Sequence, residues 1–412
     1  MSATDFLQTS LQSTVEAAVS DGLPGLTFGA LWRDAASGNV YRVWASTGSL
    51  PLPEDGKTID VTPDTMLPVF SFSKLVVAIA VMQLVEREKL GWMTRPELIA
   101  NGIAQDDGSK LPLRVPVTVR ALLTHTAGLG FPPTANKFPP MYGWDIPFAQ
   151  EPGQAWAYSY GFDWLGRLIA RKTGLSLRRM SIKTLQIRSG SNSFSRRNPT
   201  LTFLGGAYSS QTRLSTGSGC HRTPLQDWKT LAVLEELLLC VFHWIAALLI
   251  TGGVGLSTGK RVLKTETVQE MIRDQLTPMG IIYPTIQESS TTTRIINDDA
   301  PPGNAKPGAK KTFAIAGEMN LVLYRSPLRT VVVWEASAGA GGPCIHNICS
   351  ALTRITSAPG LIGQTVSNKD SSVDPKIGLV CVSGTQVLPY FTPVNESFPG
   401  MRAEGPYGQT VR

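Results

Sequence analysis

The spacing of hydrophobic positions along the chain changes from strand-like to helix-like and back. Residues 26–48 hold two β-rich runs around the sequence DAASGN, which predicts two strands joined by a turn. The prolines of Asp60–Phe70 favour an extended segment. A helix is then predicted from about Ser71 to Lys89, with a stop at Gly91. Its apolar face consists of Leu75, Ile79, Met82, Leu84 and Val85.

Helical patterns continue through the middle of the chain. We expect a short helix within Pro116–Gly130 that ends at a Gly-containing turn. A second helix is expected near Phe162–Lys172 and should end at Gly174, and a surface helix is expected within Ser257–Leu276.

One segment, residues 231–253, is far more apolar than the rest. Its uninterrupted apolar part, residues 237–250, contains His243 and is shorter than the ~20 residues that a membrane-spanning helix needs. This pattern favours a buried helix, and we expect no membrane partner.

Strand character returns in Arg329–Trp334 and in Lys376–Gly384. The order of strands, then helices, then strands predicts an α/β (α+β) fold, with a sheet built from both ends of the chain and a helical part inserted between them. We expect a single domain over residues 1–412. Its sheet part would lie at about 1–70 and 310–390, and its helical part at about 71–276.

Composition and charge limit the possible function classes. The chain is 42% hydrophobic and 17% charged, as soluble globular proteins are. The net charge of +7 comes from residues 176–229, which hold nine Lys and Arg side chains and one acid, Asp227. That segment has no nucleic-acid-binding motif, aromatic stacking sites or helical periodicity, so we expect no nucleic-acid partner.

The N-terminal residues and the cysteines indicate the compartment. The first residues lack a basic stretch followed by a continuous apolar core, so no secretory signal is predicted. The five cysteines are odd in number and have no repeated spacing. Reduced thiols in a cytoplasmic protein are the simplest interpretation.

The candidate chemistry begins with an S-x-x-K motif, Ser71 and Lys74 in the sequence SFSK. Side chains three positions apart on a helix share one face, where a lysine amine can accept the proton of a serine hydroxyl. A serine at the first turn also lies near backbone N–H groups that can stabilise an oxyanion. The alternative is a serine that only caps the helix.

The surrounding motifs resemble the serine β-lactamase and penicillin-binding-protein family. The stretch TMLPVFSFSKLVVAIAVMQLVEREKLG is similar to its nucleophile helix, and VTVRALLTHTAGLG is similar to the LLTHTSGL stretch of the class C β-lactamase and family VIII carboxylesterase branch. The sequence EPGQAWAYSYGFDWLG resembles the segment that carries a catalytic tyrosine, here Tyr158. Near the C-terminus, DPKIGLVCVSGTQVLP resembles fungal acyltransferases that attach side chains to statin-like polyketides.

The resemblance implies a β-lactamase/transpeptidase-like fold with an antiparallel sheet, and a serine acyl-transferring enzyme. Ser71 would form the acyl-enzyme, and Lys74 and Tyr158 would share the general-base work. The β-lactamase Y-x-N motif reads Tyr158-Ser159-Tyr160 here, which favours the esterase and acyltransferase branch. The histidine of the THTAGL stretch, His125, belongs to a structural turn in this family, so a buried hydrogen-bonding role is expected for it.

The same resemblance implies the reactants. The donor would be a small ester or thioester, free or carrier-bound, and the acceptor a secondary-metabolite alcohol. No cofactor is expected. The alternatives are a carboxylesterase that hydrolyses small esters and a relative that keeps the fold but has an impaired site.

Other motifs fit their function classes less well. The sequence GLSTG fits the G-x-S-x-G elbow of α/β-hydrolases with Ser257 as nucleophile, His346 as base and Asp298 or Asp299 as acid, but the elbow needs a strand before it and a helix after it. The segment Gly303–Thr312 has phosphate-loop glycine spacing, but Ala309 replaces the required lysine. No spacing of His, Cys, Asp or Glu predicts a metal site.

Two segments depart from the family pattern, residues 178–247 and 321–373. The second should contain a Trp-Gly-Gly strand that helps form the oxyanion hole. Trp334 with Gly341 and Gly342 is the nearest substitute as a substrate-binding group. A changed reading frame or retained intron sequence would explain both segments, and transcript reads across their boundaries test this hypothesis.

Overall fold

The structure is a computed structural model, and it describes the parts of the chain that build the sheet and its neighbouring helices. The described residues are 3–20, 24–34, 36–51, 58–63, 65, 72–94, 102–105, 109–129, 148–175, 179–180, 239–256, 259–282, 310–324, 326–333, 363–364, 369–375 and 378–384.

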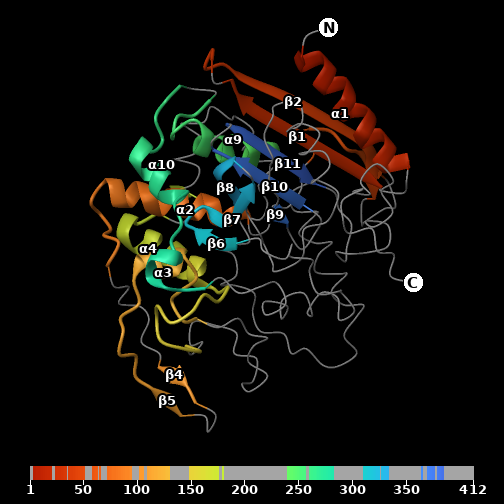
Figure 1. The fold of residues 1–412 in the computed structure, drawn as a ribbon. Helices are drawn as coiled ribbons and strands as arrows, with labels where there is room; N and C mark the ends of the chain where they lie inside the picture. Colours follow the sequence, from red (N-terminus) through yellow and green to blue (C-terminus); the bar gives the residue numbers. More distant parts are fainter. Residues whose placement is uncertain are drawn as a thin grey trace, which may run out of the picture.

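Both ends of the chain contribute to one nine-stranded antiparallel sheet (Figure 1). Strand β1 (Gly25–Arg33) pairs on one side with β2 (Val40–Pro51) and on the other with β11 (Leu379–Gly384). The strand order is β3-β2-β1-β11-β10-β8-β7-β6, with β9 paired to β10. The other strands are β3 (Thr58–Asp60), β6 (Lys310–Ala314), β7 (Gly317–Tyr324), β8 (Ser326–Val333), β9 (Gly363–Gln364) and β10 (Lys369–Asp374). The predicted sheet of N- and C-terminal segments is confirmed.

Alternating side chains of the central strands face two separate cores. Phe28 of β1 and Cys381 of β11 pack with helix α1 (Ala3–Ser20) on one face. Leu31, three positions after Phe28, and Val380, one position before Cys381, join the main core on the other face. A period of two along each strand therefore gives both sheet faces an apolar layer.

Helix α1 is absent from the sequence-based expectations. Its buried residues are separated by four, four and three positions, which is helical spacing, and they are Leu7, Leu11, Val15 and Ala18. Gln8 adds a polar tie to the sheet, because its side-chain amide donates to the Trp44 carbonyl and accepts from the Trp44 N–H.

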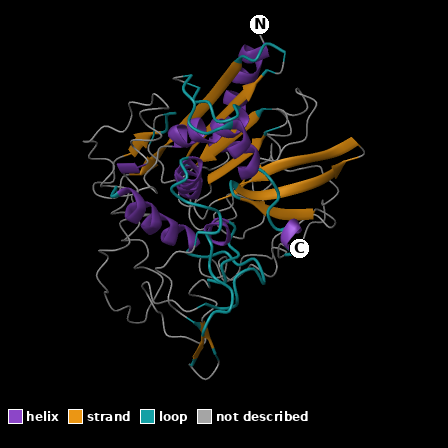
Figure 2. Cartoon of the chain, turned by 90° about the vertical axis from the view of Figure 1, so that its left-hand side faces the viewer, coloured by secondary structure: helices purple, strands orange, loops and turns teal. Residues whose placement is uncertain are grey.

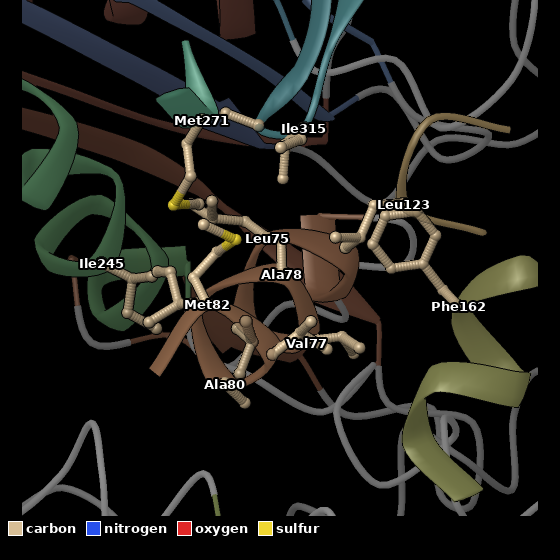
Figure 3. Close-up of a cluster of buried hydrophobic side chains, with 14 of the residues drawn as sticks. Leu75, Val77, Ala78, Ala80, Met82, Leu123, Phe162, Ile245, Met271 and Ile315 are labelled. Carbon is tan, nitrogen blue, oxygen red and sulfur yellow. The ribbon is translucent and has the colours of Figure 1, made fainter. Parts of the chain in front are cut away.

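Helix α2 (Ser73–Glu86) lies at the centre of the main core, and Figure 3 shows its side chains among those of other elements. Every residue from Leu75 to Leu84 is buried, so the expectation of a single apolar face is wrong. The reason is tertiary, because the core cluster places α2 among apolar residues of the sheet, α4 (Gly161–Thr173) and α9 (Leu239–Ile250). The helix begins two residues later than predicted, with Phe72 at the N-cap position.

The other helices differ in how well they match expectation. Helix α3 (Val119–Leu123) lies within the predicted segment, and α4 ends at Gly174, whose left-handed conformation caps the helix as expected. The surface helix predicted within Ser257–Leu276 is shorter, because α10 covers only Thr265–Met271 and a β-bridge between Val254 and Arg261 precedes it.

The very apolar segment forms α9, and its residues 245–250 are buried in the main core, as predicted for a buried helix. Across the described parts of the chain, no helix combines the length and apolar character needed to cross a bilayer.

In the side view of Figure 2, several helices lie over the strands of the sheet, and one longer helix lies to the side of them. The short β4 (Ile103–Ala104) and β5 (Lys110–Leu111) hairpin projects away from the rest in both Figure 1 and Figure 2. Part of the atypical segment 321–373 belongs to the sheet through β7, β8 and β10. Of the segment 178–247, only residues 179–180 and 239–247 are described. The single-domain division stays a prediction.

Candidate active site

Lys74 lies in the first turn of α2, half-buried, beside the loop that precedes α4. The helix that carries it is fixed by the buried residues that follow, beginning with Leu75. The Lys74 side chain reaches the ring of Tyr158, with Nζ 4.8 Å from the ring centroid. The structure therefore brings together two of the three predicted catalytic residues, which are 84 positions apart in the sequence.

Tyr158 lies in a segment without regular secondary structure that directly precedes α4. The backbone N–H of Ala157 donates to the His125 carbonyl at 2.9 Å, and the backbone N–H of Ser159 donates to His125 Nδ1 at 3.1 Å. The Tyr158 side chain is half-buried and packs against a small cluster formed by Trp156, Leu276, Ile281 and Phe313. The site thus lies where the helical part meets the edge strand β6 (Figure 1).

His125 is buried, with 1% of its surface exposed, which confirms the predicted buried hydrogen-bonding residue. Its ring stacks on Tyr158 with centroids 4.6 Å apart and an interplanar angle of 28°. Three further aromatic rings surround it with centroids 5.3–5.8 Å away, those of Trp156, Phe162 and Phe313.

The environment of His125 keeps its imidazole neutral. Burial, with an added contribution from the positive charge of Lys74, holds the pKa of His125 well below its usual value of 6.5. Because Nδ1 accepts the Ser159 N–H, the ring proton belongs on Nε2. A buried imidazole that stays neutral is suited to hold neighbouring groups in place and is poorly suited to accept a proton as a general base.

A polar network holds the edge strand beside this cluster. Arg120 of α3 donates to Glu270 at 2.9 Å and also to the Gln275 side chain. The backbone N–H of Gln275 in turn donates to the Phe313 carbonyl of β6 at 3.0 Å. Asp274 accepts a hydrogen bond from Thr312 of the same strand. These contacts connect α3, α10 and β6, and thereby support Phe313 against His125.

Several predicted site residues lie outside the described residues. They are Ser71, the substrate-binding candidates Trp334, Gly341 and Gly342, and the competing set of Ser257, His346, Asp298 and Asp299. Their roles stay predictions.

Sequence reasoning missed two features of the site. Phe313 gave no signal, because its contact with His125 joins positions far apart in the chain. Gly161 could have been suspected, since it directly follows the Tyr158 motif and opens α4. An added Cβ there would lie 2.7 Å from the Leu122 carbonyl oxygen, so only glycine allows α3 and α4 to approach this closely.

Comparison with known proteins supports the same family at the level of sequence. The family model described as β-lactamase matches residues 29–182. An acyltransferase of Penicillium decumbens is 31% identical over 153 residues, which are 31% of this chain and 37% of that protein. The lovastatin esterase of Penicillium rubens is 31% identical over 140 residues, 28% of this chain and 35% of that protein. The matched part thus spans little more than a third of these relatives.

Solved structures extend the likeness to the whole fold. A variant of simvastatin synthase from Aspergillus terreus has a TM-score of 0.61 at 20% identity, covering 96% of this chain and 94% of that one. A hydrolase with promiscuous acyltransferase activity, EstCE1, has a TM-score of 0.56 at 16% identity, covering 93% and 94%. At such identities the likeness shows the fold alone, and that fold is the β-lactamase/transpeptidase-like one that the motifs indicate. The chain thus matches the β-lactamase family model over residues 29–182 and has the β-lactamase/transpeptidase-like fold.

Proposed function

We propose that this protein is a serine acyltransferase that moves an acyl group through a Ser71 acyl-enzyme to a secondary-metabolite alcohol. The observation that carries the proposal is the contact between Lys74 and Tyr158, with Nζ 4.8 Å from the ring centroid. Lys74 stands three positions after Ser71 at the start of α2. This contact places the ammonium over the face of the phenol ring, and the proposal adds that the amine and the phenol oxygen of this pair share the proton of the serine nucleophile.

The first half-reaction forms the acyl-enzyme. Ser71 Oγ attacks the carbonyl carbon of an ester or thioester, and its proton passes to the pair of Lys74 and Tyr158. The tetrahedral intermediate then breaks the bond to the leaving group, and Tyr158 returns the proton to the departing oxygen or sulfur. The oxyanion of the intermediate needs N–H donors, and we assign this role to the segment that contains Trp334, Gly341 and Gly342.

The second half-reaction differs between transfer and hydrolysis only in the acceptor. In transfer, an alcohol hydroxyl gives its proton to the same pair and attacks the acyl carbonyl, which releases a new ester and the Ser71 hydroxyl. In hydrolysis, water takes the place of the alcohol. Among similar proteins, a monacolin J acid methylbutanoyltransferase of Aspergillus terreus supports transfer, whereas an esterase of Burkholderia gladioli supports hydrolysis.

The Tyr158 motif favours this branch over β-lactam hydrolysis. The third position of the motif is Tyr160 instead of asparagine, so the site lacks the amide group that β-lactamases of this type have there. Ser159, at the second position, is buried and turned toward His125, with its Oγ 3.3 Å from Nδ1.

The proposal is tested by acylation with a p-nitrophenyl ester. We expect a burst of p-nitrophenol and a gain of one acyl group in the mass of the intact protein. Ser71→Ala should abolish both. Ser73→Ala, the same change two positions later at a buried residue of α2, should retain the burst. Absence of acylation in the unmodified, folded protein would contradict the proposal and favour the relative with an impaired site.

A second step separates transfer from hydrolysis. The acyl-enzyme is formed from an acyl thioester and mixed with a polyketide alcohol. Accumulation of the new ester supports the acyltransferase, whereas release of free acid at the same rate with and without the alcohol supports the carboxylesterase.

A further inference from the structure

We infer that His125 is the positioning residue for Tyr158, acting through its ring and through hydrogen bonds on both sides of the tyrosine. The inference rests on the proposed role of Tyr158. His125 makes no proton transfer in this scheme, so its effect on the reaction depends entirely on where it holds the tyrosine.

The hydrogen bonds to His125 fix the backbone of the tyrosine segment at two points. The His125 carbonyl accepts from the N–H of Ala157 at 2.9 Å, and Nδ1 accepts from the N–H of Ser159 at 3.1 Å. These donors belong to the residues directly before and after Tyr158. The backbone carbonyl and the side chain of one residue, His125, therefore fix the backbone on both sides of Tyr158.

The ring of His125 also fixes the side chain of Tyr158. The two rings are stacked with centroids 4.6 Å apart, within the range of favourable aromatic contacts. Phe162 and Phe313 pack against His125 with centroids at 5.3 and 5.4 Å, so the imidazole cannot turn away from the tyrosine without displacing them. Lys74 Nζ also contacts this ring, 4.8 Å from its centroid, so the stacking on His125 holds the tyrosine in the position where it meets the lysine.

The backbone of His125 has a left-handed conformation that is uncommon for residues other than glycine. His125 has a φ of 56°, and it follows Thr124, the C-cap residue of α3. Glycine or asparagine usually occupies this left-handed position after a helix, because other side chains are strained there. Among the described residues only one other non-glycine residue, Glu88, has a positive φ. Strain of this kind is held where a side chain is needed in one place.

The kinetic test is a double-mutant cycle on the rate of acylation by a p-nitrophenyl ester. His125→Asn keeps a residue that tolerates the left-handed conformation but removes the ring. We expect it to lower the acylation rate at least about tenfold with KM changed less than twofold, because small displacements of a reacting group are costly. In the Tyr158→Phe background, the same change should lower the residual rate less than twofold.

Two further variants separate positioning from general damage to the fold. Thr124→Ser keeps the hydroxyl that bonds the Arg120 carbonyl and Thr126, so it should acylate within twofold of the unmodified protein. Phe162→Leu loosens the support of His125 without touching its hydrogen bonds. Phe162→Leu should slow acylation when Tyr158 is present and should not slow it in the Tyr158→Phe background. This variant tests the inference if His125→Asn fails to fold. Equal losses in both backgrounds would overturn the inference.

A measurement that needs no activity tells failure of this inference apart from failure of the proposed function. The protein is labelled with 3-fluorotyrosine, and the ¹⁹F resonance of position 158 is assigned as the one lost in Tyr158→Phe. We expect His125→Asn to shift or broaden this resonance, and Thr124→Ser to leave it in place. An unchanged resonance in His125→Asn contradicts the positioning role. Lack of acylation in the unmodified protein, with the resonance shifted by His125→Asn, contradicts only the proposed function.

Discussion

Leu75 offers a quantitative test of how the core supports the candidate site. It follows Lys74 directly in α2 and is 1% exposed. Figure 3 shows it in a group of buried side chains to which α2, α3, α4 and α9 all contribute. Truncation of this side chain to alanine removes packing around the helix that carries the lysine.

The expected cost follows from the atoms removed. Leu75→Ala deletes roughly three methylene equivalents, worth about 2.4 kcal/mol at about 0.8 kcal/mol each. The cavity that remains adds to this, so we expect a loss of about 3 kcal/mol in the free energy of unfolding. With an unfolding entropy of about 2.1 cal/mol/K per residue over the 412 residues, this corresponds to a Tm lower by about 3–4 °C.

The measurement is thermal unfolding followed by scanning calorimetry, with Leu111→Ala as the matched control. Leu111 lies in β5 and is 51% exposed, so the same substitution should change stability by less than about 0.5 kcal/mol. If the two variants were shifted equally, the placement of α2 at the centre of the core would be refuted.

Three other predictions follow from the contacts around the site. Gly161→Ala should destabilise the protein by about 1–3 kcal/mol and slow acylation, because its Cβ would lie 2.7 Å from the Leu122 carbonyl; Gly91→Ala, where the nearest atom is 3.5 Å away, is the control in the same two assays. Burial acts to raise the pKa of Glu270, but hydrogen bonds from Arg273, Arg120 and Gln275 outweigh it and hold that pKa below 4.5. The Glu270 carboxylate therefore binds fewer protons in the native state than in the unfolded state. The stability that it contributes is lost as the pH falls from about 4.5 through the lower pKa of the native state. Urea titrations at pH 6 and pH 3 give the free energy of unfolding at each pH. The difference between the two values should be smaller for Glu270→Gln than for the exposed Glu266→Gln, and equal differences would count against the network. The pKa of His125 is also lowered, so native His125 stays neutral while the unfolded chain takes up a proton, and stability should fall as pH drops below about 6.5. Tm measured between pH 8 and pH 5 checks this, because His125→Asn should remove the part of the decrease in Tm that His125 causes. An unchanged decrease in Tm with pH would contradict the lowered pKa of His125.

Local patterns in the sequence were sufficient for the elements that carry the site. The S-x-x-K motif lies where a helix begins, and the structure has α2 there with Lys74 in its first turn. The tyrosine motif precedes α4, which ends at Gly174 as its left-handed cap requires. The two N-terminal strands follow from β-rich runs and a turn between them. In each case, residues close in sequence determine the structure, so the pattern is readable without the fold.

Contacts between distant segments were decided only by the tertiary structure. The pairing of β1 with β11 and the burial of α2 on nearly all sides depend on which elements pack together, and periodicity carries no record of that choice. The sequence identified His125 as a residue of a structural turn. Its stacking on Tyr158 and its contact with Phe313 exist only because α3, the tyrosine segment and β6 meet at one point. Sequence indicated which residues are candidates for the chemistry, and the packing of remote elements determined how Lys74, Tyr158 and His125 are held, because side-chain orientation is set by non-local contacts.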